Sequence, residues 1–166
     1  MNEELIKCPC CGKLVPGNDI ELSYIRPDDL ARLDQCEIDE HCQFSEDYYI
    51  YTNQYFFLRC VLPLPVNGRD REYCIGVWVQ LSEDNFSTVW ELWDDVNQQN
   101  NPPLKGLLAN NVHLNSGCIG SDVLIRLVSP DERPRIEVLN EKCSLFLEQH
   151  SGISIHRVSE YSDLCR

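Results

Sequence analysis

The segment EYCIGVWVQLSEDNFSTVWELWDDV (Glu72–Val96) predicts a strand that runs directly into a helix. In its first part the side chains alternate, and those expected on one face are Tyr73, Ile75, Val77, Val79 and Leu81. This alternation is typical of a half-buried strand. Ser82 is placed to cap the helix, and apolar residues recur behind it at helical spacing, namely Phe86, Val89, Trp90, Trp93 and Val96.

Shorter elements are predicted on both sides of this unit. Tyr48–Thr52 and Tyr55–Leu62 predict a hairpin that ends at Pro63 and Pro65, and the central helix is expected to stop near Asn100. Lys105–Gly120 is expected to be irregular. The later predicted elements are strands at Val123–Val128 and Arg135–Leu139, a helix from Glu141 to Gln149, and a last helix capped by Ser154. The prediction is one α+β domain over residues 1–166, with a mainly antiparallel sheet of about five strands, a central amphipathic helix and C-terminal helices.

The chain is strongly acidic, with 27 acidic against 14 basic residues among 166 and a formal net charge of −13. This charge argues against binding to nucleic acid or to an anionic membrane, and it favours a basic protein partner. The N-terminus, MNEELIKCPCCG, has no apolar signal region, and no apolar run approaches the ~20 residues that span a bilayer. We therefore expect a cytoplasmic protein whose ten cysteines are reduced unless they bind metal.

Cys8 and Cys11, followed by Gly12, have the C-x-x-C-G spacing of half a zinc site. A structural site needs four ligands, and the nearest residues that could complete it are Cys36, His41 and Cys42. Residues 8–42 are thus a candidate zinc-knuckle segment at the N-terminal end of the domain. The alternative is a turn of reduced cysteines without metal.

Acidic residues gather in two places that a basic partner could contact. Glu83 and Asp84 begin the central helix, and Glu91, Asp94 and Asp95 lie off its apolar stripe. A second group lies before the first hairpin, at Glu37, Asp39, Glu40, Glu46 and Asp47, and exposed aromatic residues are expected at Tyr48, Tyr49 and Tyr51. If the two groups face the same way, they form one negative patch that would steer a basic partner.

Cys118 lies in the glycine-flanked stretch Asn115–Gly120, five residues after His113. A cysteine near a histidine is the minimum that a thiol-dependent hydrolase needs, although no third orienting residue is identifiable. Chance proximity in a cysteine-rich chain is the simpler explanation.

Four stretches occur in an order that resembles the bacterial domain-of-unknown-function family DUF2199. They are CPCCG (Cys8–Gly12), FFLRCVLPLPV (Phe56–Val66), GVWVQLSEDNF (Gly76–Phe86) and EQHSGIS (Glu148–Ser154). The resemblance implies a compact α+β fold without an assigned activity, and it brings no catalytic residues. Family members often carry a histidine shortly after the knuckle, where this chain has Lys13, Leu14 and Val15.

These observations favour a non-enzymatic, acidic protein-binding domain of a bacterial cytoplasmic protein. An immunity protein that neutralises a basic toxin is the specific form of this prediction. Two alternatives stay open: a zinc-stabilised domain with a housekeeping or regulatory interaction role, and a cysteine-dependent enzyme that uses Cys118.

Overall fold

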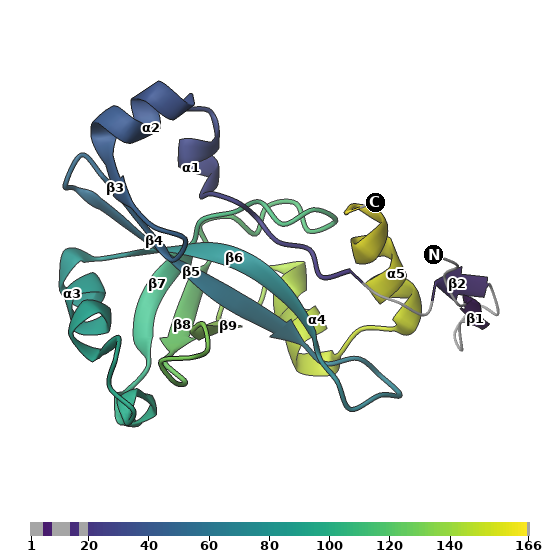
Figure 1. Cartoon of the computed structure of the whole chain (residues 1–166). Helices are drawn as coiled ribbons and strands as arrows, with labels where there is room; N and C mark the ends of the chain where they lie inside the picture. The colour runs from purple at the N-terminus through teal and green to yellow at the C-terminus, as the bar shows by residue number, and fades with distance from the viewer. Residues whose placement is uncertain (1–4, 8–13, 17–19, 166) are drawn as a thin grey trace.

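A computed structural model describes residues 5–7, 14–16 and 20–165 (Figure 1). The strands are β1 (Leu5–Lys7), β2 (Leu14–Pro16), β3 (Cys42–Phe44), β4 (Tyr48–Tyr51), β5 (Tyr55–Leu64), β6 (Tyr73–Leu81), β7 (Leu104–Leu108), β8 (Asp122–Arg126) and β9 (Arg135–Val138). The helices are α1 (Asp28–Ala31), α2 (Gln35–His41), α3 (Glu83–Leu92), α4 (Ser144–Ser151) and α5 (Ile155–Asp163), with a 3₁₀ turn at Gln98–Asn100. No helix in this described part of the chain is both long and apolar enough to cross a membrane.

Seven strands form one sheet in sequence order from β3 to β9, and every neighbouring pair in that order is antiparallel. A parallel contact between Val61 of β5 and Arg135 of β9 closes five of the strands on themselves. The predicted α+β class and mainly antiparallel sheet are confirmed. The predicted hairpin is the β4–β5 pair, and Thr52 and Asn53 in its turn have positive φ values of 51° and 57°.

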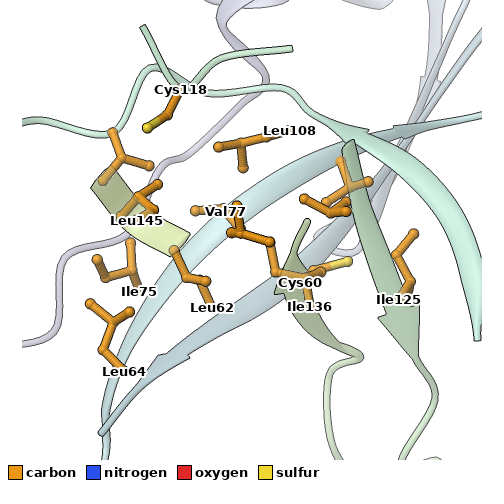
Figure 2. Close-up of a cluster of buried hydrophobic side chains, with 14 of the residues drawn as sticks. Cys60, Leu62, Leu64, Ile75, Val77, Leu108, Cys118, Ile125, Ile136 and Leu145 are labelled. Carbon is orange, nitrogen blue, oxygen red and sulfur yellow. The ribbon is translucent and has the colours of Figure 1, made fainter. Parts of the chain in front are cut away.

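The main core lies inside this closed sheet and beneath α3, α4 and α5 (Figures 1 and 2). All five residues predicted on one face of β6 are buried there. Figure 2 shows that Ile75 and Val77 of β6 lie in one cluster with Leu62 of β5, Ile136 of β9 and Leu145 of α4. The alternation in the sequence therefore identified the inward face of β6 correctly.

The opposite face of β6 carries a second, smaller core under α1 and α2. Trp78 is buried there against Leu30, Ile38 and Tyr49, and its indole nitrogen donates to the carbonyl of Tyr24 at 2.8 Å. Tyr49 was expected to be exposed, and this prediction is wrong because the ring packs edge-on against Trp78. Both faces of β6 are thus covered in its central part.

Two predicted boundaries differ from the structure. The central helix ends at Leu92 and not near Asn100, and Val96, expected on its buried stripe, is exposed. β5 continues through Pro63 to Leu64. Proline is tolerated at this position because the amides of Arg59 and Val61, four and two residues earlier, point away from β6, so Pro63 lacks a donor only on that outer side.

Several of the elements were not predicted, among them α2 and β7. α2 lies in the acidic stretch before the hairpin, and Asp34 caps it by accepting a hydrogen bond from the amide of Glu37 at 2.8 Å. The D-x-x-E spacing of these two residues is a capping signal that could have revealed the helix. β7 lies in the segment expected to be irregular, and it pairs with β6 through only two residue positions.

Three of the residues in the stretches that resemble DUF2199 have structural roles, because they hold neighbouring segments of the chain together or end a helix. Gly76 approaches Ser23 so closely that an added Cβ would lie 2.8 Å from the Ser23 Cβ. Gln149 donates to the carbonyl of Ile136 at 2.8 Å and accepts from the amide of Val138, so it ties α4 to β9. Gly152 ends α4 with a φ of 83°, a conformation that favours glycine.

Candidate functional site

Helix α3 is held against the sheet at its start and along one face. Ser82 caps it by accepting a hydrogen bond from the amide of Asn85 at 3.1 Å. The side chain of Asn85 donates to the carbonyl of Lys105 on β7 at 3.0 Å. Phe86 and Val89 are buried against the sheet, which leaves the rest of the helix facing outward at the left of Figure 1.

A pocket of about 250 Å³ lies between α3 and the start of the β4–β5 hairpin. Its buried floor is Leu58, Phe86 and Val89. Its partly or largely exposed walls are Tyr48, Trp90 and Trp93, and its polar rim is Ser45, Asp47 and Asp94. The apolar surface thus lies inside the pocket, and both carboxylates lie at its mouth.

The aromatic walls pack against one another. The Tyr48 ring meets Trp90 edge-on with centroids 5.4 Å apart, and it meets Phe86 at 5.9 Å. Trp90 nevertheless stays 59% exposed. A large exposed indole at the edge of an apolar pocket is the kind of residue that contributes most to protein–protein binding.

The five predicted partner-binding carboxylates are all exposed, but they form two groups at opposite ends of α3. Glu83 and Asp84 lie in the first turn, where the positive end of the helix dipole stabilises them. Glu91, Asp94 and Asp95 lie at the other end, where the dipole is unfavourable for anions and no basic residue occupies the last turn. None of the five forms an ion pair with a residue that the structure describes.

The second predicted acidic group is also divided. Glu37, Asp39 and Glu40 belong to α2 on another part of the surface, whereas Glu46 and Asp47 lie in the turn between β3 and β4. Asp47 and Asp94 line the same pocket. The structure therefore brings part of the loop and one end of α3 together, and it leaves the α2 carboxylates apart from them.

Arginine residues support the turn behind Asp47. The backbone amide of Arg59 donates to the Asp47 carbonyl at 2.9 Å, and Nε of Arg133 lies 3.7 Å from the Asp47 carboxylate. Burial and the nearby charge of Arg133 lower the pKa of the Arg59 guanidinium. Of the two rim carboxylates, Asp94 is the one that forms no ion pair with a described residue.

The C-terminal end of α3 is fixed by Gln98, which is buried. Its amide nitrogen donates to the carbonyls of Leu92 and Trp93 at 3.0 Å each and to that of Asp95 at 3.2 Å. The Leu92 and Asp95 carbonyls also accept from the backbone amides of Asp95 and Gln98, whereas the Gln98 side chain is the partner that the described residues offer to the Trp93 carbonyl. This contact positions the segment that carries Asp94 and Asp95.

The predicted metal ligands fall in separate places. Cys8 and Cys11 lie outside the described residues; the strands that flank them, β1 and β2, lie beside α5 (Figure 1). Cys36, His41 and Cys42 belong to α2 and the start of β3, at the opposite end of the molecule. Within the described part of the chain, no three His, Cys, Asp or Glu side chains gather as a metal site. Zinc binding stays a prediction.

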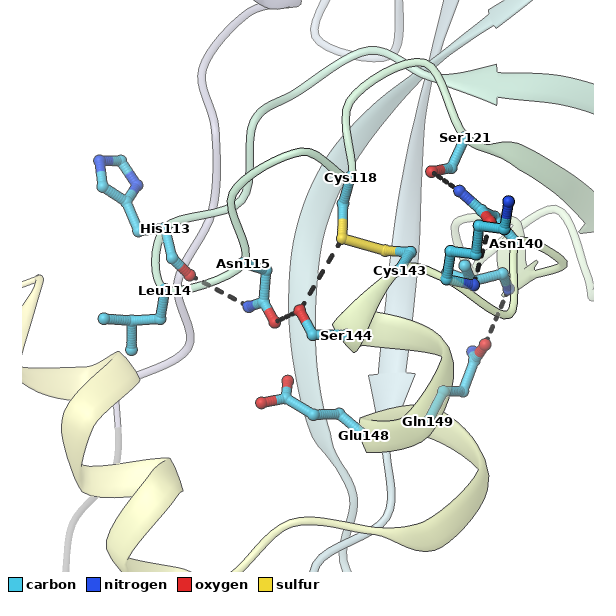
Figure 3. The surroundings of a disulfide bond; sticks show 12 residues. His113, Leu114, Asn115, Cys118, Ser121, Asn140, Cys143, Ser144, Glu148 and Gln149 are labelled. Atoms are coloured by element: carbon cyan, nitrogen blue, oxygen red, sulfur yellow. Dashed lines mark hydrogen bonds between the residues drawn. A yellow bond between two sulfur atoms is a disulfide. The ribbon is translucent and has the colours of Figure 1, made fainter.

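The prediction that all cysteines outside a metal site are reduced is wrong for Cys118 and Cys143, and the alternative of a thiol nucleophile at Cys118 has no free thiol in this structure. Cys118 forms a disulfide with Cys143, the residue that precedes α4, and it is fully buried (Figure 3). Its former candidate partner, His113, instead stacks on Tyr24 and hydrogen-bonds to the Tyr24 hydroxyl at 2.8 Å. A bonded sulfur offers no thiolate, so the two groups do not form a nucleophile and base here.

Four residues that line the pocket were predicted from the sequence to lie on the buried stripe of the helix, namely Phe86, Val89, Trp90 and Trp93. Trp90 and Trp93 fit the helical apolar stripe, yet they lie at its edge, where the pocket opens. The two tryptophans within four residues of one another, beside three carboxylates, were the available signal. Ser45 and Leu58 gave no signal, because their contribution depends on how the hairpin packs against α3.

Comparison with family models matches residues 7–153 to the family described as "Uncharacterized protein conserved in bacteria (DUF2199)". Comparison with the curated proteins and with the solved structures found no match. The matched range includes the whole sheet, α3 and the pocket beside it. The chain therefore belongs to the bacterial family DUF2199.

Proposed function

We propose that this chain is a non-enzymatic binding domain whose partner is a basic protein, and that the partner docks on the end of α3 and the adjacent pocket. The observation that carries the proposal is the placement of Glu91, Asp94 and Asp95 at the negative end of the helix dipole. Negative charge there is disfavoured by the helix dipole in the free protein. A cationic partner surface would relieve this repulsion on binding.

The specific form of the proposal is a cytoplasmic immunity protein that neutralises a basic toxin. The net charge of −13 supports rapid, electrostatically steered capture of such a partner. The exposed Trp90 supplies apolar contact area beside these carboxylates.

The test is co-expression with the product of the gene immediately upstream, chosen where that product is basic and toxin-like. We expect a stable complex and relief of growth inhibition, both weakened by the triple variant Glu91→Lys, Asp94→Lys, Asp95→Lys. The matched control reverses Glu37, Asp39 and Glu40 on α2, which are also exposed and equal in number. Equal binding by both triple variants would rule out the α3 face.

Zinc binding near the N-terminus is a second role, compatible with the first, that one observation favours. β1 and β2, which flank Cys8 and Cys11 in the sequence, pair antiparallel with Lys7 opposite Leu14. Paired cysteines between two such strands are typical of zinc-stabilised hairpins. Metal content of the full chain, compared with a Cys8→Ser/Cys11→Ser variant, tests this: zinc in the wild type alone would support it, and equal metal content would refute it.

A further inference from the structure

We infer that the pocket beside α3 binds one large apolar side chain of the partner, and that basic residues flanking this anchor pair with the carboxylates at the pocket mouth. This inference rests on the proposed function and names the recognition element at the same site. Its ligand is a basic segment with a single apolar anchor.

The apolar floor of the pocket favours an apolar side chain as its ligand. Leu58 and Val89 on the floor are each only 2% exposed and offer no polar group to a guest. A charged group pushed onto this floor would lose its hydration without gaining a partner. An apolar side chain would instead remove the remaining exposed surface of the floor and walls from water.

The size of the pocket agrees with a single side chain. Its volume of about 250 Å³ lies below the roughly 300–1,000 Å³ typical of sites for small-molecule ligands. The pocket is also open at a surface that already carries an exposed Trp90. Both features suit an anchor residue presented by another protein.

The carboxylates at the mouth of the pocket favour basic residues on either side of the apolar anchor. Asp47 and Asp94 line the rim, and Glu91 and Asp95 extend the negative charge along the end of α3. Between Glu83 and Leu104 the chain has five carboxylates and no lysine, arginine or histidine. Lysine or arginine residues on either side of the anchor would meet only negative charge from this segment.

A cage for a quaternary ammonium group is the nearest alternative, and the ring geometry disfavours it. Tyr48, Phe86 and Trp90 contact one another, with centroid separations between 5.4 and 6.1 Å. A cage instead needs ring faces arranged around an open centre that the cation occupies. The rings here fill that centre themselves.

The experiment compares two acetylated, amidated peptides of equal charge, KKLKK and KKSKK, by NMR titration of the full chain. We expect KKLKK to shift the indole resonances of Trp90 and Trp93 and to bind about tenfold more tightly than KKSKK, as partial burial of one leucine side chain predicts. Trp90→Ala should abolish the difference between the peptides, whereas Leu147→Ala, at a similarly exposed apolar position on α4, should keep it. Asp94→Lys should weaken both peptides, and Asp122→Lys on β8 should weaken them much less.

Three results would overturn the inference: equal affinity for the two peptides, displacement of KKLKK by tetramethylammonium at millimolar concentration, or peptide shifts confined to another surface. These results are separate from failure of the proposed function. If the upstream gene product binds the α3 face but KKLKK does not, the anchor is refuted and the function stands. If KKLKK binds selectively but no basic protein does, the pocket stands and the function fails.

Discussion

The side-chain amide nitrogen of Gln98 donates a hydrogen bond of 3.0 Å to the carbonyl oxygen of Leu92, the last residue of α3. The same nitrogen also reaches the carbonyls of Trp93 and Asp95. One buried amide therefore closes the helix and fixes the turn that carries the acidic rim of the pocket.

Replacing Gln98 by alanine should lower the free energy of unfolding by about 1–3 kcal/mol, because the Trp93 carbonyl loses its hydrogen-bond partner and the buried side chain that closes the helix end is removed. Urea denaturation measures this change. Gln99→Ala is the matched control, since Gln99 is exposed and should change stability by less than about 0.5 kcal/mol. Equal effects of the two variants would show that Gln98 does not hold the helix end.

Neutralising the carboxylates of α3 should have opposite effects at its two ends. Glu91→Gln and Asp94→Asn remove negative charge from the negative end of the dipole, and each should stabilise the chain by about 0.3–1 kcal/mol at low salt. Glu83→Gln and Asp84→Asn remove favourable charge from the first turn and should destabilise it by a similar amount.

Thermal unfolding at low and high salt measures both pairs, and the differences should shrink at 1 M salt because the charges are exposed. The same Glu91 and Asp94 changes should weaken the proposed partner complex. If these variants are more stable but bind the partner more weakly, Glu91 and Asp94 contribute to binding at the expense of stability. Stabilisation at both ends would show that general charge repulsion, and not the dipole, governs the effect.

Gly76→Ala should destabilise the chain by about 1–3 kcal/mol, because the new Cβ would lie 2.8 Å from the Cβ of Ser23. The amide of Tyr24 donates to the Gly76 carbonyl and the amide of Gly76 donates to the Leu22 carbonyl, so this contact also aligns the segment that covers the edge of β6. Adding Ser23→Gly removes the clashing carbon and should recover most of the loss. If stability is not recovered in this double-mutant cycle, the loss caused by Gly76→Ala does not come from the contact with the Ser23 Cβ.

The sequence predicted what depends on local periodicity and capping. The inward face of β6, the hairpin, and the Ser82 and Ser154 caps follow from residue spacing alone, and each matches the structure. The exposure of Tyr49 and Val96 was predicted wrongly because it depends on tertiary packing. The Tyr49 ring packs edge-on against Trp78. The helix ends at Leu92, where the Gln98 side chain binds the Leu92 carbonyl, so Val96 lies outside the helix.

The candidate site was predicted only in part for the same reason. Charge counts identified the carboxylates of α3, but the division into two groups follows from where the helix ends. The pocket depends on Asp47 and Leu58, which are distant from α3 in sequence and meet it only through the packing of the hairpin. No local pattern in the chain indicates that contact.

Alkaline pH should destabilise the fold through Tyr73. Burial raises the pKa of this phenol from 10.0 to about 12, so its contribution is fully present below pH 10 and is lost as the pH rises toward 12. Tyr73→Phe cannot ionise, so its free energy of unfolding should fall less between pH 9 and pH 11.5 than that of the wild type. At pH 7 the variant should be less stable, because the amide of Leu22 and the carbonyl of Ile20 lose the hydroxyl. Equal alkaline losses would refute the role of Tyr73.

The Cys118–Cys143 disulfide closes a loop with a sequence separation of 25, for which chain-entropy estimates give about 3.5 kcal/mol of stabilisation. Cys118→Ser/Cys143→Ser should lose stability of this order. Dithiothreitol should destabilise the wild type but not this double variant, which also controls for the other cysteines. An equal response of both proteins to dithiothreitol would show that another thiol is responsible.

The same bond tests the proposed compartment. Structural disulfides are rare in the cytoplasm, so a chain that works there should carry Cys118 and Cys143 as thiols. Both are buried, and reduction therefore requires the loop before β8 and the start of α4 to open. Acid quenching of cells, followed by alkylation with a maleimide polymer under denaturing conditions, counts the free thiols in place. Two extra modified thiols relative to the air-oxidised purified protein would support a cytoplasmic site, whereas equal counts would place the functioning chain in an oxidising environment.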